Sequence, residues 1–238
     1  MKIKNLVIVG LVYLVLATAG GQSFAEQYWA AAKALPVNGK VILIDAGHGG
    51  ADPGKTGTMK DEKDLNLIIA KQLQAYLEMG GASVLMTRTE DEMLKKSETA
   101  TKKEDMQLRG EMIRQYDPDL VISIHQNSFP DGKYWGPQVF YWEANDEGQQ
   151  LALLIQEQLN IFTGGKRQCK ANGDYYILKQ SEKTAVLVEC GFLTNTAEEA
   201  RLNDETYQKK IAWSIYSGIN AYFEEEEHGN TVDTHGGS

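Results

Sequence analysis

Short apolar runs alternate with segments of helical periodicity along this chain, and this alternation is the feature that most constrains its fold. Residues 40–45 form a β-rich apolar run that ends in a glycine-rich loop. Leu65, Ile69 and Leu73 then recur at helical spacing before a second apolar run at residues 83–87. A strand, a helix and a strand in this order form a βαβ unit, which requires parallel strands and a right-handed crossover.

The same alternation continues to the end of the chain. Further helices are expected at residues 106–115, 148–162 and 206–223, and further strands at residues 120–124, 138–142, 175–178 and 185–188. The pattern predicts one three-layer α/β domain over residues 40–223, with a mostly parallel twisted sheet flanked by helices.

Two polar stretches do not fit a packed core. Residues 90–104 carry five acidic residues and four lysines, which predicts a solvated surface loop. Residues 224–238 begin with four consecutive glutamates and continue with polar residues and glycines. This composition predicts a disordered acidic and polar tail.

The first residues are typical of an export signal. Lys2 and Lys4 precede an apolar run of 14 residues at 6–19, and Ser23-Phe24-Ala25 offers small residues at a cleavage site. The run is shorter than the roughly 20 residues that span a bilayer. We therefore expect residues 1–25 to be a cleaved signal peptide and residues 26–39 an N-terminal segment, with an uncleaved anchor as the alternative.

The charge of the chain limits its partners. Lys and Arg total 24 against 33 Asp and Glu, so the formal net charge is −9, which disfavours nucleic acid as a partner. Cys169 and Cys190 allow one disulfide but neither a disulfide framework nor an all-cysteine zinc site.

Residues 49–56 match the phosphate-loop pattern G-x-x-x-x-G-K-[ST], but their context contradicts a nucleotide site. A phosphate loop needs its helix to begin at the Lys-Thr pair, whereas helical periodicity here begins near Glu62. No later apolar strand ends in an aspartate that could hold magnesium. We therefore expect no nucleotide.

Two histidines and two glutamates follow predicted strands or begin a helix at one edge of the sheet. His48 and His125 each come directly after an apolar strand, Glu62 begins the first long helix, and Glu189 closes another strand. Carboxyl ends of parallel strands share one edge, so these side chains should converge. Two His and one Glu form an open three-ligand zinc site, and a second Glu can take a proton from water.

At these positions the chain resembles the zinc-dependent N-acetylmuramoyl-L-alanine amidases of bacterial cell walls, of the zinc-exopeptidase-like type. The matching pieces are Ile44-Asp45-Ala46-Gly47-His48-Gly49-Gly50, Glu62-Lys63, Ser123-Ile124-His125-Gln126-Asn127-Ser128 and Val188-Glu189-Cys190-Gly191-Phe192-Leu193-Thr194-Asn195. The loop departs from the family at Ala46, where proline is common. We expect this to change loop rigidity and not chemistry.

The resemblance implies a function and a site. One zinc ion would be bound by His48, Glu62 and His125, Glu189 would be the catalytic glutamate, and Gln126 and Asn127 could orient substrate. The substrate would be peptidoglycan, cleaved between N-acetylmuramic acid and L-alanine. The strand at residues 138–141 and the lack of a wall-binding domain resemble the germination-specific type of spore formers, which trims cortex for muramic-δ-lactam formation.

Such an enzyme would act in the cell wall or in the forespore intermembrane space, and some relatives need an activating partner protein. Two alternatives remain open from the residues: a zinc peptidase or carboxypeptidase on the same fold, and a weakly catalytic peptidoglycan-binding module. A carboxypeptidase would need a cation for a terminal carboxylate, for which Arg88, Arg109 and Arg167 are candidates. Tyr134, Trp135 and Phe140 are candidates for a glycan-facing patch.

Overall fold

The computed structural model describes residues 35–95 and 100–233. The predicted signal peptide and residues 26–34 lie outside these residues. Six strands form one sheet in the order β2-β1-β3-β6-β4-β5. Their bounds are β1 Val41–Ala46, β2 Ser83–Met86, β3 Leu120–Asn127, β4 Gln138–Tyr141, β5 Lys170–Ala171 and β6 Thr184–Phe192. All neighbours are parallel except β4 and β6, which confirms the predicted mostly parallel sheet.

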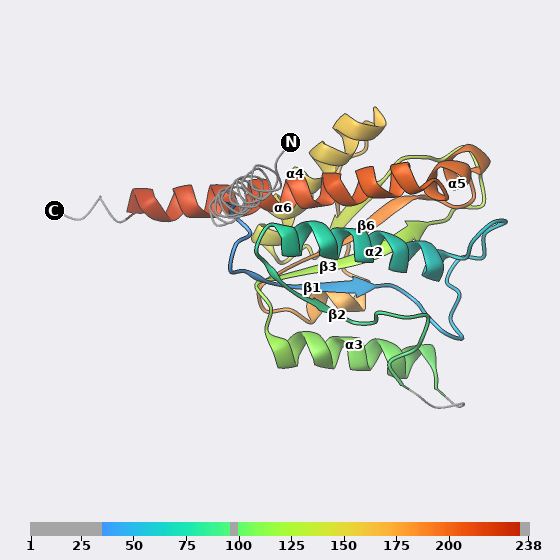
Figure 1. Cartoon of the computed structure of the whole chain (residues 1–238), viewed down its shortest axis with the longest axis horizontal. Helices are drawn as coiled ribbons and strands as arrows, with labels where there is room; N and C mark the ends of the chain where they lie inside the picture. Colours follow the sequence, from blue (N-terminus) through green and yellow to red (C-terminus); the bar gives the residue numbers. More distant parts are fainter. Residues whose placement is uncertain (1–34, 96–99, 234–238) are drawn as a thin grey trace, which may run out of the picture.

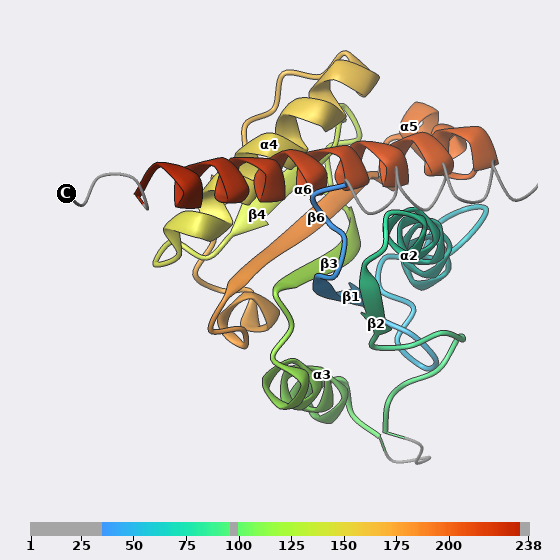
Figure 2. The same cartoon turned by 60° about the vertical axis from the view of Figure 1, so that its left-hand side comes forward.

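Helices cover both faces of this sheet (Figures 1 and 2). The helices α2 (Glu62–Met79), α4 (Asp146–Thr163) and α6 (Glu205–Asp233) pack together on one face, and α3 (Lys102–Tyr116) lies on the other. The short η1 (Tyr176–Lys179) contacts α3, and α5 (Thr196–Leu202) follows β6. The predicted three-layer arrangement is therefore correct.

Two apolar cores explain the layers. Alternate side chains of a strand point to opposite faces, so Ile42 and Ile44 of β1 pack in the larger core with α2, α4 and α6. Leu43 points the other way and packs with Ile113 of α3. Because strands bury both faces, they read as continuous apolar runs in the sequence.

The polar stretch at residues 90–104 is more ordered than its composition predicts. Met93 is buried, and α3 begins at Lys102 with Thr101 as its N-cap. Thr101 and Glu104 form a reciprocal capping box, which satisfies backbone N–H groups at the helix start. The surface-loop prediction is therefore wrong for Met93, which is buried, and for residues 102–104, which are helical, while residues 96–99 lie outside the described chain.

The predicted tail also begins as a helix. The helix α6 continues to Asp233 instead of ending at Phe223 (Figure 1). The Tyr222 hydroxyl donates a hydrogen bond to Glu226, and Lys40 lies 3.7 Å from the Glu226 carboxylate. These contacts give the glutamate run folded partners, so the prediction of disorder is wrong for residues 224–233. Residues 234–238 lie outside the described chain.

Two smaller expectations change. Residues 175–178 contain a 3-10 turn, η1, in place of a strand, because Leu178 and Gln180 donate backbone hydrogen bonds to carbonyls three residues earlier. Cys169 and Cys190 are both free thiols. Among the residues that the structure describes, no helix is long and apolar enough to cross a membrane.

One irregularity lies at the carboxyl edge of the sheet. His125 pairs with Glu189, but Asn127 pairs with Phe192, so β6 holds one extra residue between these two pairs. This is a β-bulge at Cys190 and Gly191. The bulge lies beside the residues that the sequence predicts as the site.

Candidate active site

His48 follows β1 in a sharply turned loop. Its backbone adopts φ 63°, a left-handed conformation that is unusual for a residue other than glycine. Gly49 and Gly50 also have positive φ, and a Cβ on Gly47 would lie 2.3 Å from the His125 ring. The loop glycines therefore allow the two histidine rings to approach closely.

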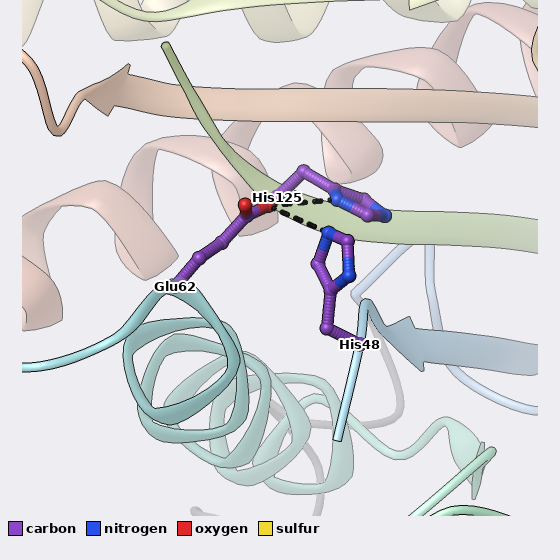
Figure 3. Close-up of side chains that lie close together, drawn as sticks. All are labelled: His48, Glu62 and His125. Carbon is purple, nitrogen blue, oxygen red and sulfur yellow. Dashed lines mark hydrogen bonds and ion pairs between the residues drawn. The ribbon is translucent and has the colours of Figure 1, made fainter. Parts of the chain in front are cut away.

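His48, Glu62 and His125 meet at the carboxyl edge of the sheet (Figure 3). The Glu62 Oε1 atom lies 3.2 Å from His48 Nε2 and 3.0 Å from His125 Nδ1. The two imidazole rings are arranged edge to face, with their centroids 4.9 Å apart. Each residue comes from a different element: the loop after β1, the first turn of α2, and β3.

This arrangement fits a metal ion. One ligand atom from each residue lies within 4.8 Å of the others. Metal–ligand bonds of about 2.0–2.2 Å in a tetrahedron place ligand atoms roughly 3.3 Å apart, close to the separations from Glu62 to each histidine. Two nitrogen donors and one carboxylate are a donor set typical of catalytic zinc and leave one position open.

Glu62 is held as an anion. Burial opposes its ionisation, but hydrogen bonds from His125 and His48 outweigh burial and keep the pKa of this carboxyl far below its usual range. The backbone N–H groups of Lys55 and Gln126 also donate to its two oxygens. The carboxylate is thus oriented before any ligand binds.

Asp52 orients His48 from the other side of the ring. Its Oδ2 lies 2.8 Å from His48 Nδ1, and its Oδ1 accepts a hydrogen bond from the Gly54 N–H. Lys102 Nζ, at the start of α3, lies 2.5 Å from Asp52 Oδ1. A carboxylate on the second nitrogen of a metal-binding histidine fixes the ring orientation and leaves Nε2 as the ligand atom. Asp52 was not predicted from the sequence.

Two buried arginines hold the His48 loop by its carbonyl oxygens. Arg109 of α3 donates to the carbonyls of Ala46 and His48 at 2.8 and 2.6 Å and forms a 2.7 Å ion pair with Asp45. Arg88 donates to the carbonyls of Ala46 and Gly47 at 2.9 and 3.0 Å. Both guanidinium groups lie behind the loop. Neither is placed to receive a substrate carboxylate.

Glu189 lies next to this cluster on β6, paired with His125 on β3. Burial raises its pKa to about 7. The Tyr175 hydroxyl lies 3.5 Å from its Oε1, whereas its Oε2 is buried with no hydrogen-bond partner among the described residues. Burial raises the pKa of Tyr175 to about 12, so this hydroxyl remains a donor at neutral pH. Tyr175 was not identified from the sequence as a site residue.

The other residues that the sequence analysis singled out differ in how exposed they are. Gln126 is 3% exposed and its side chain donates a hydrogen bond to Asn66 Oδ1, so its amide is held inside the protein. Asn127 is partly exposed at the end of β3. Phe140 is buried against Tyr175, which contradicts its proposed place in a surface patch, whereas Tyr134 and Trp135 are exposed.

Residues 42–221 match the sequence family described as N-acetylmuramoyl-L-alanine amidase. The chain belongs to this family. Its reaction is therefore hydrolysis of the amide between N-acetylmuramic acid and L-alanine, and its substrate is peptidoglycan. This finding decides in favour of the predicted amidase over the peptidase alternative.

Individual amidases resemble the chain over most of its length. The germination-specific N-acetylmuramoyl-L-alanine amidase of Bacillus subtilis is 38% identical over 197 residues, which cover 81% of this chain and 83% of that protein. The CwlD amidase of Clostridioides difficile, solved in complex with the GerS lipoprotein, matches with a TM-score of 0.74 and 40% identity, over 78% of this chain and 98% of that one. The catalytic domain of CwlV from Bacillus (Paenibacillus) polymyxa var. colistinus matches with a TM-score of 0.68 and 28% identity, over 78% and 98%.

Proposed function

We propose that the chain is a zinc-dependent amidase in which His48, Glu62 and His125 bind one zinc ion and Glu189 transfers protons. The observation that carries this proposal is the meeting of these three ligands beside a buried glutamate with one unpaired oxygen. Bound zinc supplies Lewis acidity, which polarises the substrate carbonyl and makes water more acidic.

Glu189 handles the proton in both halves of the reaction. Its carboxylate accepts a proton from the attacking water, whose oxygen bonds to the carbonyl carbon. When the carbon–nitrogen bond breaks, the same carboxyl group returns a proton to the departing L-alanine nitrogen. A raised pKa suits a group that must be a base first and an acid afterwards. The Tyr175 hydroxyl orients Oε1 of this carboxylate and leaves Oε2 free for the proton.

Metal content tests the ligand assignment. Replacing His48 or His125 with Ala should abolish stoichiometric zinc in elemental analysis, while the far-ultraviolet circular dichroism spectrum stays native. Retention of one zinc ion per chain by both variants would refute the assignment.

The role of Glu189 is tested by Glu189→Gln, which keeps the shape of the side chain and removes its basicity. Zinc content should stay near that of the wild type, while turnover falls by roughly two to four orders of magnitude. Loss of zinc together with activity would make Glu189 a ligand, and preserved turnover would remove it from the mechanism.

The biological setting is also part of the proposal. We propose export to the cell wall compartment and action on spore cortex, because the chain begins with a signal-like segment and is similar to a germination-specific amidase. Expression of this chain in sporulating Bacillus subtilis cells that lack the germination-specific amidase should restore muramic-δ-lactam to the spore cortex. Cortex without the lactam, despite export of folded enzyme, would contradict this role.

A partner protein belongs to the same proposal, since the similar CwlD structure is a complex with a lipoprotein. We expect that a purified lipoprotein encoded in the same genome as this chain, when it is added to the purified chain, raises the zinc content or the turnover. No change in either quantity, with binding confirmed, would contradict an activating role.

A further inference from the structure

The strand order arranges the site residues in a line along the carboxyl edge of the sheet. His48 follows β1, His125 lies on β3 and Glu189 on β6, which are successive neighbours in the sheet. The next strand, β4, begins at Gln138, which pairs directly with Glu189. The edge therefore continues past Glu189 toward β4 and β5.

The order of these residues along the edge implies how the bound substrate is oriented, an inference that rests on the proposed function. Because Glu189 returns a proton to the departing amine, the L-alanine nitrogen must lie on the Glu189 side of the metal ligands. The peptide stem begins at that nitrogen. It should therefore extend over the start of β4 and β5, while the sugar lies on the other side.

A hollow of about 340 Å³ lies in that direction, between the loop before β4 and the loop after α4. Tyr134 and Trp135 line it and are 40% and 44% exposed. Lys166 and Arg167 supply positive charge to the same wall, and Lys170 continues this charge at the start of β5.

Arg167 is the organised cation in this hollow. Its guanidinium carbon lies 4.7 Å from the centre of the Phe192 ring, Nε donates to the Trp135 carbonyl at 2.7 Å, and Nη1 donates to Gln138 Oε1 at 3.2 Å. Within the described residues, its Nη2 has no hydrogen-bond partner. A fixed guanidinium with free N–H groups is the side chain best suited to a carboxylate.

Acidic neighbours do not cancel this charge. Asp131 forms an ion pair with Lys133, and Glu198, whose oxygens accept N–H groups from Gly136 and Phe192, interacts electrostatically with Arg167. These two acidic residues face three cations that line the hollow, Lys133, Lys166 and Arg167. Lys166, within the part of the chain that the structure describes, forms no ion pair. The hollow therefore keeps a net positive charge.

The distance suits a carboxylate a few residues from the cleaved bond. Paired residues of antiparallel strands lie about 5 Å apart, so the Arg167 guanidinium, one hydrogen bond beyond Gln138, is on the order of 10 Å from Glu189. An extended peptide covers about 3.3–3.6 Å per residue, so this span corresponds to roughly three residues.

We propose that the hollow formed by Tyr134, Trp135, Lys166 and Arg167 is the subsite for the peptide stem, and that Arg167 binds a carboxylate of that stem. The aromatic rings form an apolar wall for the peptide, and the free guanidinium N–H groups select an ionised carboxyl group. This subsite determines which stems are cleaved and takes no part in bond breaking.

Peptide binding tests the proposal without catalysis. The probe is the free stem tripeptide, either ionised or with its carboxyl groups converted to carboxamides, measured by calorimetry against the zinc-loaded protein. The wild type should bind the ionised form about 10–100-fold more tightly, and Arg167→Gln should lose this preference. Arg167→Lys should retain part of it.

Arg114→Gln is the matched control, because Arg114 is an exposed arginine in the last turn of α3 and does not line the hollow. It should behave like the wild type. Equal binding of both peptide forms by the wild type, or an unchanged preference in a folded Arg167→Gln protein, would overturn the subsite.

Kinetics separates this inference from the proposed function. With a muramoyl tripeptide, Arg167→Gln should raise KM about tenfold or more and leave kcat near the wild-type value. A wild-type enzyme that binds the ionised tripeptide but never cleaves the muramoyl substrate would refute the proposed function alone. A fall in kcat with KM unchanged would refute the subsite alone.

Discussion

At the His48 end of the site, side chains from several elements hold the loop by its backbone oxygens, whereas at the Glu189 end one carboxylate oxygen has no partner among the described residues. Arg109 and Arg88 together reach the carbonyls of residues 46, 47 and 48. Glu189 Oε2 is buried and unpaired. The half that we propose binds the metal is held rigidly, and the glutamate half leaves room for a reacting group.

This difference matches the demands of the proposed mechanism. Metal ligands must hold one geometry throughout, because small displacements weaken coordination. A proton-transfer group must exchange partners between water and amine, so a saturated set of protein hydrogen bonds would hinder it. The following predictions test the contrast, from the largest expected effect to the smallest.

Replacing Arg109, which donates hydrogen bonds to the carbonyls of the His48 loop, should be the most damaging change. Arg109→Leu leaves Asp45 buried without its ion-pair partner, which should lower the free energy of unfolding by about 3–5 kcal/mol. Zinc affinity should fall as well, because the His48 carbonyl loses its donor. Chemical denaturation and zinc titration measure the two effects.

Arg114→Leu is the control on the same helix. It removes an exposed arginine and should change stability by less than about 0.5 kcal/mol. Similar losses in the two variants would show that the Arg109 effect is not specific to the loop.

Glu189 should make the stability of the metal-free protein depend on pH. Its folded pKa of about 7 exceeds the usual 4.5, so between these values the folded state retains a proton that the unfolded state releases. This contribution is complete below pH 4.5 and is lost as the pH rises to 7. Glu189→Gln should therefore gain stability relative to the wild type across this window, by up to about 3 kcal/mol. A difference independent of pH would contradict the buried, unpaired carboxyl.

Asp52 should affect metal affinity more than folding. Asp52→Asn removes the negative charge beside His48 Nδ1 and should weaken zinc binding by about 10–100-fold. Lys102→Ala removes only an exposed partner of Asp52 and should change the affinity by less than about threefold. Equal effects would mean that the ion pair, and not the histidine contact, determines the affinity.

The helical extension of α6 should matter least, because it belongs to neither half of the site. Truncation after Phe223 removes the Lys40–Glu226 contact and the hydrogen bonds of Tyr222 to Glu226 and of Gln150 to Glu225, which are exposed or partly exposed, and should cost about 1 kcal/mol. Turnover should be unchanged. A large loss of activity would connect this helix to the site.

The sequence predicted the parts of the site that follow from chain topology. His48, His125 and Glu189 come at strand ends, and a parallel sheet places strand ends at one edge. It did not predict which charged residues would be buried. Arg88, Arg109 and Arg167 were equivalent candidates for a carboxylate, yet two lie behind the loop and one lies beside a surface hollow.

Contacts that depend on the folded backbone account for most of what the sequence missed. Asp52 lies four residues after His48, a spacing that could have been noticed, but its hydrogen bond depends on the loop geometry. Tyr175, the residue before η1, contacts Glu189 from a segment that the sequence predicted as a strand. The order at residues 101–104 follows from a local signal, Thr and Glu three residues apart, that the high charge density obscured.

The bulge in β6 has a consequence for how this strand could change in length. Glu189 and Phe192 are three residues apart, so a regular strand would place them on opposite faces. The extra residue opposite β3 places both on the face that bears His125 and Asn127. Deleting one residue at Cys190 or Gly191 would make β6 a regular strand in which Phe192 follows Glu189 by two residues, so both would keep their face and their pairing with β3. A single-codon deletion could therefore remove the local bend of β6 while Glu189 and the ring beside Arg167 keep their places.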